Sequence, residues 1–231
     1  MSGHIVAMGG ATLRPEDYDP RLDAFVLSLA RRLRPRVCCV GTASGDSPVY
    51  VANFYRAFSG HHDCEPSDLA LFERTVAELR AFVLEQDVVY VGGGNTVSLL
   101  AVWRAHGLDA VPREAWERGT VLCGSSAGMN CWFEASTTDS FDLNRVAGLN
   151  DGLGLLPGSE CPHYDGEDQR RPLYRRLVKE GALPPGYAAD DAAALVFEGT
   201  SLREVVTASE GSTGYRVDAS GEVALAARLL V

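Results

Sequence analysis

The chain has 231 residues, of which 46% are hydrophobic and 23% are charged, and its formal net charge at pH 7 is −10. This length is enough to bury a complete hydrophobic core, and it fits one globular domain over residues 1–231 better than two. Because Asp and Glu outnumber Lys and Arg, we expect no binding to a nucleic-acid backbone.

The sequence also argues against membranes and metals. No run of about 18 apolar residues occurs, and the first residues lack the basic start and long apolar stretch of a signal peptide. We therefore expect a soluble cytoplasmic protein, as a monomer or a homodimer. The six cysteines are scattered, with no C-x-x-C pair that would indicate zinc or a redox site, so free and mostly buried thiols are expected.

Short apolar runs typical of β-strands alternate with stretches of helical spacing along the chain. The expected strands are residues 4–10, 36–44, 87–95 and 119–128, and the expected helices are residues 20–33, 68–86 and 95–108. This alternation predicts an α/β fold, with a mainly parallel sheet and helices on both of its faces. Residues 188–208 and 214–231 resemble strands joined by short turns, which would complete the sheet or add a small antiparallel edge. In such sheets ligands bind at the carboxyl ends of the strands.

A serine turn follows the fourth predicted strand. Gly124, Ser126 and Gly128 fit the pattern G-x-S-x-G, with the strand "TVLC" before them and the helix candidate "AGMNCWFEA" after them. A sharp strand-to-helix turn would expose Ser126 above the sheet and direct Ser125 elsewhere, while the N–H of Ala127 could face a developing oxyanion. The alternative is a turn that only caps the helix.

A glycine-rich turn, "VGGGNT", ends the third predicted strand. Three glycines permit a close approach of the backbone, so the N–H of Gly93 or Gly94 could supply a second oxyanion donor. We place Asn95 with the residues that bind substrate. The alternatives are a phosphate cradle, which lacks the lysine of a P-loop, and a plain turn in which Asn95 or Thr96 caps a helix.

Five histidines are available as a general base. His163 is the best candidate, because it lies in "SECPHYDGED", just past a proline, as expected for a loop at the end of a strand. The alternative is a purely structural histidine.

Four motifs now occur together: "VYVGGGNTVSLL", "GSSAGMN", "CPHY" and "ADDAAALVFEG". In order and approximate spacing they resemble the dipeptidase E (aspartyl dipeptidase) and cyanophycinase family of serine peptidases, over nearly the whole chain. The resemblance implies a flavodoxin-like α/β fold related to class I glutamine amidotransferases. It also implies a Ser-His-Glu triad with no cofactor.

The family's functional residues carry over by position. The nucleophile falls on Ser126 and the base on His163, and the oxyanion donors fall on Gly94, or its neighbour Gly93, and on Ala127.

The family's acid falls on Asp191, where this sequence has Asp in place of Glu. Because Asp is one methylene shorter, the loop would move inward or the neighbouring Asp190 would serve. Two other carboxylates compete: Glu134, eight residues along the presumed helix after Ser126, and Asp139.

The family's substrate-binding arginine has no exact counterpart, because the segment after the histidine is shortened to "HYDGEDQRRPLYRRL". Arg170 or Arg171 could bind a substrate carboxylate in the bidentate manner of a guanidinium. The alternative is that these arginines pair with Asp165, Glu167 or Asp168 on the surface.

The sequence therefore predicts a serine peptidase that acts on small peptide substrates, with an N-terminal Asp as one candidate for the first residue. Two alternatives remain. One is an esterase of the α/β-hydrolase type, and the other is a non-catalytic protein that binds a small ligand on an amidotransferase-like scaffold.

Overall fold

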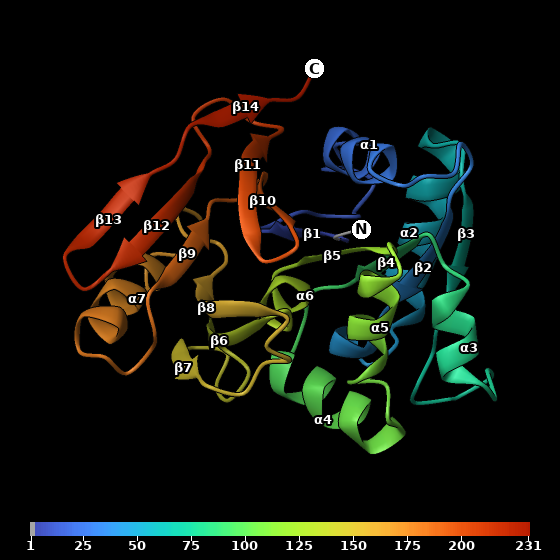
Figure 1. Ribbon diagram of the computed structural model, residues 1–231, viewed down its shortest axis with the longest axis horizontal. Helices are drawn as coiled ribbons and strands as arrows, with labels where there is room; N and C mark the ends of the chain where they lie inside the picture. Colours follow the sequence, from blue (N-terminus) through green and yellow to red (C-terminus); the bar gives the residue numbers. More distant parts are fainter. Residues whose placement is uncertain (1–2) are drawn as a thin grey trace.

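The computed structural model describes residues 3–231, and these residues form two β-sheets surrounded by helices (Figure 1). The strands of the first sheet, in spatial order, are β14 (Ala227–Leu229), β11 (Ser201–Thr207), β10 (Ala193–Glu198), β1 (His4–Met8), β5 (Val121–Ser125), β4 (Val88–Val91), β2 (Arg36–Val40) and β3 (Glu65–Asp68). The strands from β1 to β3 run parallel, whereas β10 pairs antiparallel with both β1 and β11.

The second sheet lies beside β10 and β11, on the left of Figure 1. Its strands, in spatial order, are β13 (Gly221–Ala224), β12 (Gly214–Asp218), β9 (Gly186–Ala189), β8 (Leu156–Cys161), β6 (Phe133–Thr138) and β7 (Ala147–Leu149). The central strands β6, β8 and β9 are parallel, whereas β7 pairs antiparallel with β6, β12 with β9, and β13 with β12.

Helices cover both faces of the first sheet. On one face pack α1 (Arg21–Ser28) and α2 (Pro48–His61), and on the other pack α3 (Leu79–Leu84), α4 (Thr96–His106) and α5 (Val111–Glu117). The short α6 (Ala127–Asn130) follows β5, and α7 (Arg170–Lys179) packs against the second sheet. Every residue of β4 and β5 is buried, as expected for parallel strands between two layers of helices.

Most of the elements predicted for the parallel core are present in the structure. The α/β class is confirmed, and strands or helices occupy the predicted positions in residues 4–10, 36–44, 87–95, 20–33 and 95–108. The closer relation to flavodoxin-like amidotransferases remains a prediction. Residues 188–231, however, do not simply extend one sheet, because β9, β12 and β13 belong to the second sheet.

Two predicted helices are wrong, and α2 is absent from the predicted elements. Residues 68–86 contain only the short α3, because the chain ends β3 at Asp68 and then runs irregularly to Leu79. The helix after Ser126 ends at Asn130, and β6 begins at Phe133. The β6 sequence "FEASTT" contains an aromatic residue and two β-branched residues, which favour a strand.

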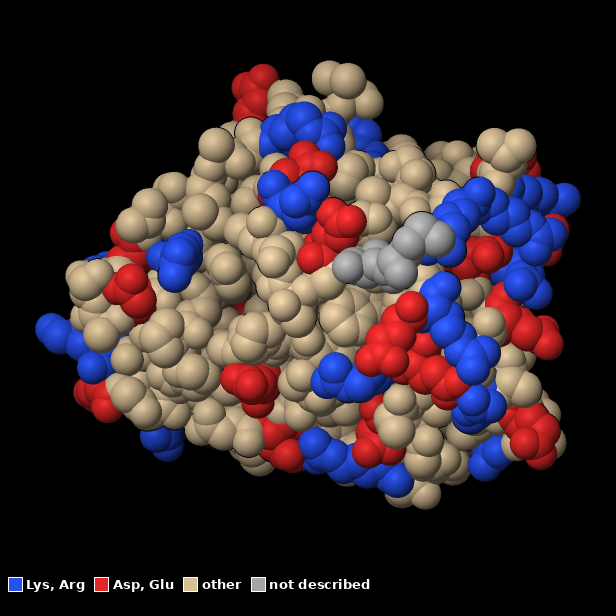
Figure 2. Space-filling view, viewed as in Figure 1, with Lys and Arg blue, Asp and Glu red and all other residues tan. Residues whose placement is uncertain are grey.

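Charge is distributed on the face shown in Figure 2 without a continuous basic stripe. Blue and red side chains alternate along the right-hand side, over the helices of the first sheet. This face therefore lacks the electrostatic pattern of a nucleic-acid binding surface.

The six cysteines are free and buried, as predicted. Within residues 3–231 no helix is long and apolar enough to span a membrane.

Candidate active site

Ser126 occupies a strained turn between β5 and α6. Its backbone has φ 55° and ψ −112°, a combination that non-glycine residues rarely adopt, and its N–H donates a hydrogen bond to the carbonyl of Met8. The neighbouring glycines make the turn possible. A Cβ on Gly124 would lie 2.4 Å from the Gly128 carbonyl oxygen, and a Cβ on Gly128 would lie 2.1 Å from the Val91 oxygen. The G-x-S-x-G pattern thus reflects close backbone packing at this turn.

Ser125 has a different environment from its neighbour. It is buried, and its Oγ accepts a hydrogen bond from the N–H of Ala11 at 2.8 Å. Ser125 therefore connects the segment after β1 to the end of β5. This contact agrees with the prediction that the side chains of Ser125 and Ser126 point in different directions.

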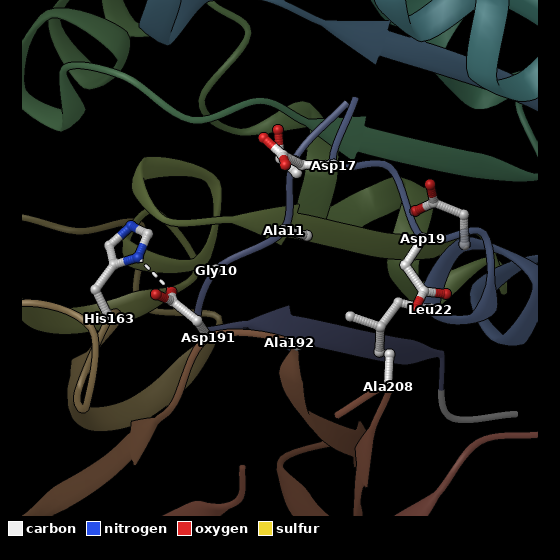
Figure 3. A pocket seen from close by; sticks show the side chains of 11 residues that line it. Gly10, Ala11, Asp17, Asp19, Leu22, His163, Asp191, Ala192 and Ala208 are labelled. Atoms are coloured by element: carbon white, nitrogen blue, oxygen red, sulfur yellow. Dashed lines mark hydrogen bonds and ion pairs between the residues drawn. The ribbon is translucent and has the colours of Figure 1, made fainter. Parts of the chain in front are cut away.

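His163 lies in the loop after β8 and contacts Asp191. Its backbone also has a positive φ, 51°, and its N–H donates to the Gly9 carbonyl. The His163 Nδ1 lies 2.6 Å from the Asp191 Oδ1 (Figure 3). This hydrogen bond lowers the pKa of Asp191 below its ordinary value, so the carboxylate is the acceptor and Nδ1–H the donor.

Several neighbours hold the His163–Asp191 pair in place. The Asp191 N–H donates to the Asp165 Oδ1 at 2.9 Å. Gly10 lies against both side chains, since a Cβ there would be 1.8 Å from the Asp191 Oδ1 and 2.8 Å from the His163 Nδ1. The absence of a side chain at position 10 is therefore a condition for this contact.

Two cavities adjoin the pair. We call the first the serine cavity: its volume is about 310 Å³, and Ser126, His163 and Gly93 are among its lining residues. The second, the acidic cavity, has a volume of about 350 Å³. Among the residues described, no hydrogen bond joins the Ser126 Oγ to His163, although the two residues line the same cavity.

The acidic cavity contains several carboxylates. Asp17, Asp19, Asp23 and Asp191 line it, and Figure 3 shows Asp191 and His163 on the side of the cavity opposite Asp19. Asp23 is buried and accepts a hydrogen bond from the Tyr18 hydroxyl at 2.9 Å. Burial raises the pKa of Asp23 to about 7, so this carboxyl is partly protonated at neutral pH.

The other carboxylates considered as partners of His163 have different contacts. The Asp190 Oδ2 accepts hydrogen bonds from the Thr213 N–H and the Tyr215 hydroxyl. Glu134 lies on β6, not on the predicted helix, and accepts from the Gly158 N–H at 2.8 Å. The Asp139 Oδ1 lies 3.8 Å from the Arg170 Nη2.

The glycine-rich turn after β4 comes close to the serine turn. A Cβ on Gly93 would lie 3.5 Å from the Ser126 Cβ, and Gly94 has φ 137° and packs against Ala43. Ala127 follows Ser126 as the first residue of α6. Gly93 and Ala127 thus both lie next to Ser126.

Asn95, which was predicted among the substrate-binding residues, has a capping role in the structure. Its side-chain oxygen accepts from the Ser98 N–H at 2.8 Å, and its amide donates to the Ser140 carbonyl at 2.9 Å. It is not among the residues that line either cavity. Both polar groups of its side chain are therefore used at the start of α4.

The two arginines of α7, predicted as candidates for substrate binding, do not line either cavity. Arg170 is buried and donates to Glu167 and to the Thr137 carbonyl. Arg171 pairs with Glu222 and lies over the rings of Tyr164 and Tyr215. The position of α7 on the second sheet directs both guanidinium groups into structural contacts.

Several residues of the serine cavity are missing from the predicted site: Arg14, Ser44, Ser47, Tyr50 and Asn53. They come from the loop after β1, from the 3-10 turn after β2 (Thr42–Ser44) and from the start of α2. No short motif marks them in the sequence, and only the fold brings them near Ser126. Within residues 3–231 no group of three or more His, Cys, Asp or Glu side chains is arranged to hold a metal ion.

Comparison with known proteins identifies the class. Residues 5–205 match the model of peptidase family S51. The chain is 48% identical to the uncharacterized peptidase YgaJ of Bacillus subtilis over 213 residues, which cover 92% of this chain and 91% of that protein. It is 33% identical to peptidase E of Shewanella denitrificans over 132 residues, and this match spans 53% of this chain and 55% of that protein.

The fold is similar to that of a solved structure. The crystal structure of a peptidase from an acI-B1 Actinobacterium superposes with a TM-score of 0.72 at 21% identity, over 98% of this chain and 95% of that one. The protein is therefore a serine peptidase with an α/β fold. Specifically, it belongs to peptidase family S51, and the predicted family is confirmed.

Proposed function

We propose that this peptidase hydrolyses dipeptides or short peptides through Ser126, His163 and Asp191. The observation that carries the proposal is the 2.6 Å contact between the His163 Nδ1 and the Asp191 Oδ1, at the edge of a cavity that Ser126 also lines. A carboxylate on Nδ1 leaves Nε2 as the free base, which is the tautomer that a serine nucleophile needs.

The reaction proceeds in two stages. The Ser126 Oγ attacks the peptide carbonyl while the His163 Nε2 takes its proton, and the same nitrogen then returns a proton to the leaving amine as the C–N bond breaks. A water molecule, deprotonated by His163, attacks the acyl-enzyme ester and releases the acid product and the free serine. Asp191 keeps the imidazole oriented in both stages.

Backbone N–H groups stabilise the tetrahedral intermediates in this proposal. The donors are Ala127, directly after the nucleophile, and Gly93 or Gly94. The proximity of Gly93 to the Ser126 Cβ supports the second donor. The cavity volume of about 310 Å³ is near the lower end of ligand pockets, which favours short peptides over folded proteins.

A fluorophosphonate probe tests the nucleophile directly. The native protein should form a covalent adduct on Ser126, located by peptide mapping, and Ser126→Ala should prevent it. A dipeptide library analysed by mass spectrometry then identifies the substrates. Hydrolysis of a nitrophenyl ester without cleavage of any peptide would contradict the proposal and indicate an esterase.

A further inference from the structure

Arg14 lies in the loop after β1 and lines the serine cavity together with Ser126 and His163. Its N–H donates to the Thr12 Oγ1 at 3.1 Å, and its carbonyl accepts from the Asp17 N–H at 3.1 Å. These two bonds form a turn that fixes the backbone of Arg14 at the rim of the cavity, while the side chain is exposed.

The guanidinium of Arg14 has no protein partner among the described residues. Within residues 3–231 it takes part in no ion pair and donates no side-chain hydrogen bond, whereas Arg170 and Arg171 are both engaged with carboxylates. A free guanidinium presents a planar pair of donors that matches a carboxylate.

The rest of the serine cavity is compatible with a negatively charged group. No Asp or Glu lines it, and the neutral side chains of Tyr50 and Asn53 share its wall with Arg14. Burial raises the pKa of Tyr50, so its hydroxyl stays neutral. The first turn of α2 also faces this cavity through Ser47 and Val49, and the amino end of a 14-residue helix adds partial positive charge.

We propose that Arg14 is the residue that binds a carboxylate of the peptide substrate and thereby determines charge specificity. This inference rests on the proposed function of the serine cavity. The carboxylate is either the side chain of an N-terminal Asp or the C-terminal carboxylate of a dipeptide. The overall charge of −10 disfavours an anionic substrate at long range. Screening over about 8 Å at physiological salt leaves the nearby guanidinium as the larger influence.

The kinetic test compares Asp-Leu with two analogues that each lack one carboxylate. Asn-Leu removes the side-chain charge, and Asp-Leu amide removes the terminal charge. In the native enzyme one of these analogues should have a kcat/KM about ten- to a hundredfold lower than Asp-Leu. The analogue that loses rate identifies which carboxylate is bound.

Arg14→Gln should remove this preference, lowering the rate on Asp-Leu by a similar factor while leaving the affected analogue nearly unchanged. The matched control is Arg56→Gln, which removes one positive charge from an exposed position on α2 outside the cavity. Equal rates of the native enzyme on all three peptides would overturn the proposal, as would equal losses in Arg14→Gln on all three.

A binding measurement separates this inference from the proposed function. In a Ser126→Ala background, Asp-Leu stays intact and its Kd can be measured by titration calorimetry. Adding Arg14→Gln should raise the Kd about ten- to a hundredfold, whereas adding Arg56→Gln should leave it unchanged. If the fluorophosphonate fails to label Ser126 but the Kd still depends on Arg14, the proposed catalytic role fails and the carboxylate site stands. If the fluorophosphonate labels Ser126 but Arg14→Gln leaves the Kd unchanged, the proposed catalytic role stands and the carboxylate site fails.

Discussion

The two sheets contribute different parts of the candidate site. The first sheet presents Ser126 on a strained turn at the end of β5, in the middle of its parallel strands. The second sheet presents His163 on the loop after β8, and Asp191 lies on the connection from β9 to β10, between the two sheets. Each sheet alone would hold only part of the machinery, so the geometry depends on how the two are joined.

The two sheets share a hydrophobic cluster, and backbone hydrogen bonds at the end of β1 connect them next to the site. The His163 N–H donates to the Gly9 carbonyl at 3.1 Å, and the Ala192 N–H donates to the Gly10 carbonyl at 2.7 Å. The segment 9–10 thus positions both the histidine and the aspartate, while Met8 just before it accepts from Ser126. The end of β1 therefore positions groups from both sheets relative to one another.

The largest effect is expected from replacing Ser126, the residue that the first sheet contributes to the candidate site. Ser126→Ala should lower kcat by a factor on the order of 10⁶, because the nucleophile is lost while the fold is kept. Steady-state hydrolysis of a dipeptide identified in the library screen measures the change.

Ser125→Ala is the matched control, one residue away. It removes the acceptor for the Ala11 N–H, a loss of about 1–3 kcal/mol in stability, and should keep most of the activity. If Ser125→Ala were the inactive variant and Ser126→Ala active, the assignment of the nucleophile to Ser126 would be wrong.

The next effect concerns the connection between the sheets. Asp191→Asn should lower kcat by about 10⁴, because the amide favours the wrong tautomer of His163. The fold should persist, since Asn is close in size to Asp and the backbone bonds around position 191 are unchanged. Kinetics on the same dipeptide, together with circular dichroism, provide the measurement.

Asp190→Asn tests the neighbouring residue at the same junction. Its Oδ2 contacts Thr213 and Tyr215 and not His163, and an amide oxygen can accept both hydrogen bonds. This variant should therefore stay within about tenfold of the native rate. A near-normal Asp191→Asn enzyme combined with an inactive Asp190→Asn enzyme would transfer the acid role to Asp190.

The smallest expected effect concerns stability, and it arises from a helix that covers the first sheet. Asp23 lies on α1, and burial raises its pKa to about 7 in the folded protein. Between the ordinary carboxyl pKa of about 4 and this value the folded state binds more protons than the unfolded state, so the contribution of Asp23 to stability falls as pH rises. Above pH 7 the penalty should be constant.

Asp23→Asn should therefore gain Tm relative to the native protein as pH increases from 4 to 7, on the order of a few degrees. Thermal unfolding at several pH values measures this, and Asp17→Asn, an exposed carboxylate of the same cavity, should show no such trend. Parallel Tm curves for native and Asp23→Asn proteins would contradict the raised pKa.

The parallel core and the serine turn could be predicted because their signals are local. Hydrophobic runs mark β1, β2, β4 and β5, and the spacing of Gly124, Ser126 and Gly128 follows from the steric crowding of one turn. The contact between His163 and Asp191 could be expected only through the family resemblance, because 28 residues separate the two positions.

The remaining features depend on tertiary structure. "AGMNCWFEA" reads as one helix, yet the partners of β6 are β8 and β7, which come later in the chain, and this non-local pairing ends α6 at Asn130. Nothing in the sequence places Arg14 beside Ser126, since a loop position depends on the elements around it. Similarly, Arg170 and Arg171 form the same local pattern whether they face substrate or Glu167 and Glu222.

The buried cysteines make the folded protein a reporter of its own opening. Burial raises the pKa of all six thiols and removes them from solvent, so alkylating reagents cannot react with them in the closed state. Because these residues lie on β2, β5 and β8 and just outside β3 and α6, each sheet carries its own label sites. The order in which the thiols become alkylated would therefore record which sheet loosens first, without any added probe.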